Sequence, residues 1–221
     1  MVPEQRILFA KEGKSKYISH LDLLRTIQRA FVRAGVSVKH SEGFNPHPKM
    51  SVALPLSVGH ESVCEILDFA LSVDMPLSEL PALITAALPE GISVLSAYAS
   101  ERKIKELKWL AVEGTLEYDA GVPDCASERI ATFFGQNRIV IAKRSKSGMS
   151  DFDIAPCIRE ISVEKGDGHT MRMRAVVMAQ NPALNPENLI NALRQLLPEL
   201  APDFTSFRRT EIYDAAGAIF R

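Results

Sequence analysis

The order in which helix and strand signals follow one another in the first half of this chain most constrains its fold. A β-prone run at 5–11 comes first. Ser19 then provides an N-cap with Asp22 three residues on, and Gly35 provides a stop, so a helix is predicted between them. The apolar residues of this helix recur at helical spacing and are Leu21, Leu24, Ile27, Phe31 and Ala34.

The first half continues with two apolar runs at 50–56 and 63–71, which predict a β-hairpin. Residues 76–88 predict a second helix, and residues 92–99 predict a fourth strand. The resulting order is β-α-β-β-α-β, which is the split βαβ arrangement. We therefore predict an α+β, ferredoxin-like domain with an antiparallel sheet over residues 1–101.

The second half repeats this order of elements without repeating the sequence. Its predicted elements are a strand at 109–118, a helix at 126–134, a strand at 138–143, a hairpin formed by 158–164 and 170–180, a helix at 186–197 and a strand at 207–213. A charged segment, 102–106, separates the halves. The sequence thus predicts two tandem ferredoxin-like domains, the second and more divergent one at 107–215, joined by this linker.

Composition places the chain among soluble globular proteins. Its 46% hydrophobic and 24% charged residues are ordinary for that class. No apolar run approaches the roughly 18 residues that a membrane span needs, so no membrane partner is expected. The N-terminus lacks the basic-then-apolar layout of a signal peptide, which leads us to expect a cytoplasmic protein.

The cysteines and histidines form no metal-binding signature. Cys64, Cys125 and Cys157 lie far apart with no CxxC spacing, which argues against a disulfide framework, a zinc ribbon or a cysteine-held cluster. Most of the histidines fall in the first 60 residues, but their spacing matches neither HxH nor HExxH. We expect no metal and no cofactor in this chain itself.

Charge is distributed unevenly along the chain. The formal net charge of −1 argues against indiscriminate coating of nucleic acid. However, residues 1–60 hold nine Lys and Arg against four Asp and Glu, whereas residues 61–100 hold six acids and no base. The first segment is therefore a candidate for anion binding, and the second is a candidate for protein contacts.

A cationic stripe is predicted on the first helix. Arg25, Arg29 and Arg33 stand four residues apart and share one face. A solvated surface would explain such a stripe equally well. Its position near four lysines in the sequence (Lys14, Lys16, Lys39 and Lys49) favours a phosphate ligand, because the guanidinium fork donates two parallel hydrogen bonds.

The loop at 41–49 combines polar side chains with Pro46 and Pro48, which restrict the residues before them. An X-Pro-X-Pro connection can also merely route the chain between elements. The predicted ligand- or phosphate-binding residues are Arg25, Arg29, Arg33, Ser41, Glu42, Asn45, His47 and Lys49. Tyr17 and Phe44 are candidates for stacking on a base, although Phe44 could instead be a core anchor.

Acid-base chemistry is an open alternative. His20 with Asp22 at the helix start, or His47 in the loop, could act as catalytic groups on RNA or on a phosphorylated small molecule. The sequence contains no Walker A, GxGxxG, GxSxG or kinase motif.

The first part of the chain resembles a bacterial family of unknown function called radical SAM-linked. The residues that carry the resemblance are 17–22, Arg25, Arg29, Ala30, 33–35, 41–49, 53–56 and Gly59. That family's domain occurs alone or at the C-terminal side of a cobalamin-binding-type radical SAM protein. The resemblance implies a radical SAM partner that would hold the iron-sulfur cluster and S-adenosylmethionine, since this chain has no CxxxCxxC.

Three functions follow as hypotheses. The first is an accessory module that binds tRNA or ribosomal RNA for a radical SAM modification enzyme and is not itself an enzyme. The second is an enzyme that uses His20 or His47. The third is a scaffold that grips the radical SAM partner through the acidic segment 61–100.

Overall fold

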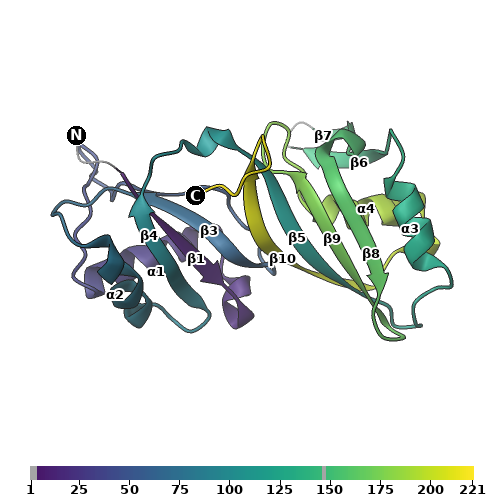
Figure 1. Cartoon of the computed structure of the whole chain (residues 1–221), viewed down its shortest axis with the longest axis horizontal. Helices are drawn as coiled ribbons and strands as arrows, with labels where there is room; N and C mark the ends of the chain where they lie inside the picture. Colours follow the sequence, from purple (N-terminus) through teal and green to yellow (C-terminus); the bar gives the residue numbers. More distant parts are fainter. Residues whose placement is uncertain (1–3, 146–147) are drawn as a thin grey trace. The chain divides into compact units, whose positions relative to one another are not determined.

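The computed structural model describes residues 4–145 and 148–221, which form a mixed α+β protein with antiparallel sheets (Figure 1). The chain divides into two compact units. The first ends at Glu106 and also includes Arg221, and the second is Leu107–Phe220. The segment 102–106, predicted as a linker, therefore falls within the first unit. Within the described residues, no helix is long and apolar enough to cross a bilayer.

The first unit has a four-stranded sheet in the order β4-β1-β3-β2, with every neighbouring pair antiparallel. Its elements are β1 Gln5–Lys11, α1 His20–Arg33, β2 Met50–Val52, β3 Glu61–Phe69, α2 Leu80–Ala87 and β4 Ile92–Ala99. The strands predicted at 5–11 and 92–99 are confirmed to the residue. The strand predicted at 50–56 is wrong in length, because β2 ends at Val52, and Pro55 has no N–H with which to continue a ladder.

Helices α1 and α2 contribute to one hydrophobic core with the sheet (Figure 1). Ile27 and Phe31 of α1 are buried there beside Phe9 of β1, and the rings of Phe31 and Phe69 meet edge to face at 5.1 Å. The predicted cap is confirmed, since the Ser19 hydroxyl accepts the backbone N–H of Asp22. Capping and an apolar stripe therefore fix both the start of α1 and its buried face.

A buried ion pair lies between the two central strands of the first unit. Arg6 of β1 is fully buried and stands opposite Asp68 of β3. Its Nε and Nη2 donate to the two Asp68 carboxylate oxygens at 2.6 and 2.9 Å, and Nη2 also donates to the Arg102 carbonyl at 2.9 Å. The pair therefore joins two strands to the segment that follows β4.

The second unit has the corresponding strand order, β10-β5-β9-β8, again antiparallel throughout. Its elements are β5 Leu107–Glu117, α3 Ala126–Phe134, β6 Val140–Ser145, β7 Gly148–Asp153, β8 Ile158–Lys165, β9 Thr170–Met178, α4 Glu187–Leu196 and β10 Phe204–Asp214. The Tyr118 hydroxyl donates to the Leu200 carbonyl at 3.0 Å, and burial raises the pKa of Tyr118 to about 12. This bond ties the segment before β10 to the end of β5.

One element of the second unit differs from the prediction. The strand predicted at 138–143 does not join the main sheet, because β6 pairs with β7 in a separate hairpin. The Gln195 side chain of α4 holds this hairpin by accepting from Ala142 N at 2.8 Å and donating to Ala142 O at 3.1 Å. Sequence analysis missed β7 because its residues are mostly polar and carry no apolar alternation.

Candidate functional site: a cationic helix face, a projecting loop and a pocket

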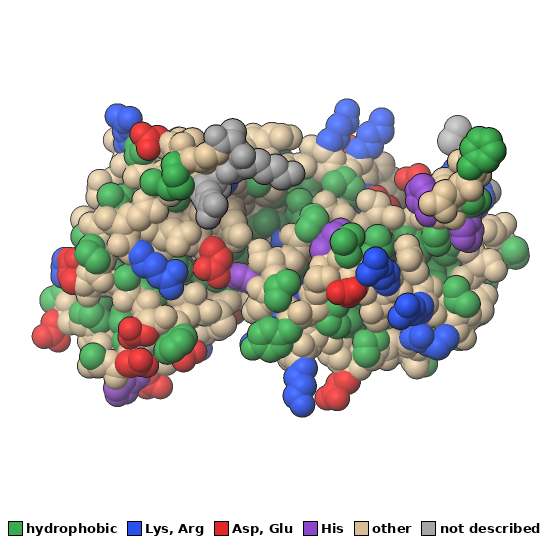
Figure 2. Space-filling view, turned by 180° about the vertical axis from the view of Figure 1, so that it is seen from behind, with side chains coloured by type: hydrophobic (Ala, Val, Ile, Leu, Met, Phe, Trp, Pro, Cys, Tyr) green, Lys and Arg blue, Asp and Glu red, His purple; other side chains and the backbone are tan. Residues whose placement is uncertain are grey.

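The exposed face of α1 carries the predicted arginine stripe. Lys and Arg side chains gather over this helix in Figure 2. Arg25 pairs with Asp22 one turn back at 3.2 Å, and Arg33 donates to the Ala87 carbonyl at the end of α2. Within the described part of the chain, Arg29 has neither an ion pair nor a hydrogen bond. Arg29 is therefore the arginine most available to a ligand.

The Asp22 carboxylate makes its hydrogen bonds within the first turns of α1 and its N-cap. Its carboxylate accepts from the Ser19 hydroxyl at 2.7 Å and from Arg25. The pKa of Asp22 is lowered, chiefly by the Ser19 hydrogen bond and further by Arg25. Nδ1 of His20 has no hydrogen-bond partner among the described residues. Among the described residues, the hydrogen bonds to the Asp22 carboxylate come from Ser19 and Arg25, and none comes from His20.

The loop 41–47 is closed at its neck. Ser41 N donates to His47 O at 2.8 Å, His47 N donates to the Ser41 hydroxyl at 3.1 Å, and that hydroxyl lies 2.9 Å from His47 Nδ1. Below the neck, Lys49 N donates to Lys39 O at 2.7 Å. His47 and Ser41 thus hold the loop together, and the residues between them project from the unit.

The tip of this loop is exposed. Gly43 has a φ of 121°, which residues with a Cβ rarely adopt, and the next residue, Phe44, is fully exposed. Phe44 is therefore not a core anchor. Glu42 and Asn45 are also exposed beside it, and Lys49 is exposed at the base. Tyr17, the other stacking candidate, is exposed with Lys16 Nζ 5.4 Å from its ring centroid.

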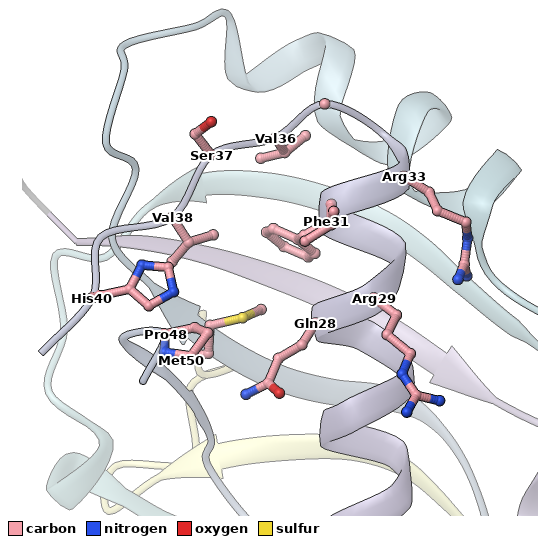
Figure 3. A pocket seen from close by; sticks show the side chains of 12 residues that line it. Gln28, Arg29, Phe31, Arg33, Val36, Ser37, Val38, His40, Pro48 and Met50 are labelled. Carbon is pink, nitrogen blue, oxygen red and sulfur yellow. The ribbon is translucent and has the colours of Figure 1, made fainter. Parts of the chain in front are cut away.

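A pocket of about 560 Å³ lies between the C-terminal half of α1 and the segment 35–50 (Figure 3). Figure 3 shows Phe31, Val38, His40 and Met50 facing a common space, whereas Arg29 points away from that space. The lining residues are Gln28, Arg29, Phe31, Val32, Arg33, Gly35, Val36, Ser37, Val38, His40, Pro48 and Met50. The stripe and the loop therefore border an apolar pocket that the sequence did not reveal.

The acidic segment 61–100 is only partly a surface. Glu61 accepts from Gly13 N at 3.0 Å, Glu65 is buried and Asp68 pairs with Arg6. The exposed acids of the segment are Asp74, Glu79 and Glu90. Among the described residues, no group of three His, Cys, Asp or Glu is placed to hold a metal ion.

Comparisons with known proteins give a family and a fold. A family model described as an uncharacterized protein conserved in bacteria (DUF2344) matches residues 5–186. No curated protein matches the chain.

A chain in the crystal structure of a Cbf5-Nop10-Gar1 complex is 14% identical, with a TM-score of 0.52 over 94% of this chain and 48% of that one. A chain of the archaeal box H/ACA sRNP Nop10-Cbf5 complex is 12% identical, with a TM-score of 0.47 over 94% and 47%. This chain thus spans about half the length of each, and at 14% identity the likeness to the first concerns the fold alone.

Proposed function

This chain belongs to the bacterial family whose model matches residues 5–186, and from that premise we propose that it is an RNA-binding accessory module for tRNA or ribosomal RNA. The family description assigns no activity, so the proposal rests on the residues of the first unit. We also propose that each unit is a ferredoxin-like domain, which the matching strand orders β4-β1-β3-β2 and β10-β5-β9-β8 support.

The observation that carries the proposal is an exposed aromatic ring at a loop tip, in the same unit as exposed cations for which the described residues supply no acidic partner. Phe44 stands fully in solvent at the tip of a loop with a closed neck. Within the region that the structure describes, neither Arg29 nor Lys49 has an acidic partner. Single-stranded RNA is bound by this combination, since bases stack on aromatic rings while cations contact the phosphates.

The proposed roles follow from exposure and bonding. Arg25, Arg29 and Lys49 contact phosphates, because their charged groups are exposed on the α1 face and at the base of the loop. Phe44 stacks on a base, and Asn45 reads its edge. Arg33 has a structural bond to α2 and adds charge. Ser41 and His47 position the loop tip through their hydrogen bonds to each other.

The test is the salt dependence of RNA binding. Replacing Arg25 and Arg29 with Ala removes two proposed phosphate contacts. Each contact to a single strand contributes about 0.7 to the slope of log affinity against log salt, so we expect a slope smaller by about 1.4. The same relation predicts about 25-fold weaker binding at about 0.1 M salt. Fluorescence anisotropy with labelled tRNA and with a ribosomal RNA fragment measures both quantities.

The matched control is Arg138→Ala with Arg194→Ala, which removes the same charge from exposed sites in the second unit. This control should bind as the unmodified protein does. Equal affinities and slopes for the two double variants would refute the assignment of the α1 face.

We further propose that the module works with a radical SAM protein, which holds the iron-sulfur cluster and S-adenosylmethionine. The support is the sequence resemblance at residues 17–59, and the exposed acids of the first unit offer a docking surface.

Reversing Asp74, Glu79 and Glu90 to Lys should slow association with a cobalamin-binding-type radical SAM protein of the same organism at least about tenfold. Surface plasmon resonance measures this rate, and reversal of Asp119, Asp124 and Glu128 in the second unit is the control. A partner that binds all three proteins equally fast would count against this surface.

The enzyme alternative has less support. Asp22 is occupied by Ser19 and Arg25, and His47 is bonded to the Ser41 hydroxyl that closes the loop. Among the described residues, neither His20 nor His47 has the carboxylate partner that an acid-base pair would use. We therefore place binding before catalysis.

A further inference from the structure

We propose that the pocket between α1 and the segment 35–50 receives one unstacked nucleobase of the bound RNA. This inference rests on the proposed function and deepens it, because it separates a base site from the phosphate contacts. The pocket volume of about 560 Å³ lies within the roughly 300–1,000 Å³ range of small-molecule sites. A single base with its ribose fits such a space, whereas a folded RNA element does not.

The interior of the pocket suits the flat apolar faces of a base. Phe31 and Val36 are buried in its wall, and Val38, Pro48 and Met50 complete the apolar lining. The ring available for stacking is the His40 imidazole, which is exposed and faces the central space in Figure 3, whereas Phe31 forms part of the buried wall. Aromatic and imidazole rings are the groups on which unstacked RNA bases settle.

The edge of the pocket supplies hydrogen-bonding groups. Gln28 brings an amide that both donates and accepts, Ser37 brings a hydroxyl and His40 brings an imidazole. In the part of the chain described by the structure, the side chains of these three residues make no hydrogen bond to protein. They are therefore available to the polar edge of a base, which carries donors and acceptors side by side.

The lining of the pocket is compatible with an anionic ligand. None of the described residues that line it is acidic, and Arg29, whose side chain points away from the central space, has no acidic partner among the described residues. The pocket thus presents no negative charge to the phosphates of a base that enters it, which favours RNA over a basic peptide.

Two probes test the base site. The first probe is a mononucleotide. AMP, CMP, GMP and UMP are each added separately to the isotope-labelled protein, and binding is followed by NMR. We expect chemical-shift changes centred on Gln28, Val38 and His40. The second is a short single-stranded RNA in which each base in turn is replaced by an abasic site. One position should lose about 5- to 150-fold in affinity, the range for loss of a stacked base.

Ser37→Trp is the pocket-blocking variant, because Ser37 is exposed at the rim. This variant should bind the intact RNA more weakly by the same factor. The abasic site should then cause no further loss of affinity, and the slope of log affinity against log salt should stay unchanged. Ser78→Trp places the same ring on an exposed site outside the pocket and should behave as the unmodified protein does.

The outcomes separate the two proposals. Salt-dependent RNA binding with no abasic penalty, no effect of Ser37→Trp and no mononucleotide shifts would overturn the base site and leave the proposed function standing. Absence of RNA binding at low salt would overturn the proposed function, and mononucleotide shifts at the pocket would then still support a base site. Shifts caused by an acidic amphipathic peptide but by no mononucleotide would overturn the base site in favour of a peptide groove.

Discussion

Replacing Arg6 with Ala is expected to lower the free energy of unfolding by about 3–5 kcal/mol. The reason is that Asp68, only 17% exposed, would lose both hydrogen bonds from the guanidinium and remain as a poorly solvated charge. The Arg102 carbonyl would lose its donor in the same step. Urea denaturation of the full-length variant, followed by circular dichroism, measures the change.

The double variant Arg6→Met with Asp68→Leu tests whether the loss of stability in Arg6→Ala comes from the unpaired Asp68 charge or from the lost packing of the Arg6 side chain. Replacement of both partners by apolar groups leaves no buried charge, so most of the stability should return. A single variant Arg6→Ala that loses less than about 1 kcal/mol, the range of exposed pairs, would show that the pair contributes as a surface ion pair does.

The position of Arg6 illustrates what the sequence can and cannot predict. Residues Gln5–Lys11 read correctly as a strand, because β-prone residues bounded by a turn depend only on near neighbours. The burial of Arg6 depends on Asp68, which lies 62 residues away and is reached only through the pairing of β1 with β3. Local patterns therefore predicted the element but not its buried ion pair.

The candidate site divides in the same way. The common face of Arg25, Arg29 and Arg33 follows from helical spacing. That Arg33 bonds to Ala87 while Arg29 has no partner in the described residues follows from the packing of α2, which spacing does not encode. The pocket was missed for the same reason, since its walls come from α1 and from a segment with no regular secondary structure.

Strand β7 was missed for a different reason. An exposed strand needs no apolar alternation, so its sequence resembles that of a loop. The hairpin is held instead by the Gln195 amide, which bonds both backbone groups of Ala142. Gln195 and Ala142 are 53 residues apart in the sequence, so no local pattern predicts this contact.

Phe44→Ala is expected to weaken RNA binding by about 5- to 150-fold, the cost of losing one base-stacking ring. Because Phe44 is fully exposed, the free energy of unfolding should stay within about 0.5 kcal/mol of its original value. The salt slope should also stay the same, since no charge is lost. Phe204→Ala is the matched control, because Phe204 is an exposed phenylalanine of the second unit and should leave RNA affinity unchanged. Equal affinity of Phe44→Ala and the unmodified protein in anisotropy titrations would remove the loop tip from the RNA-binding surface.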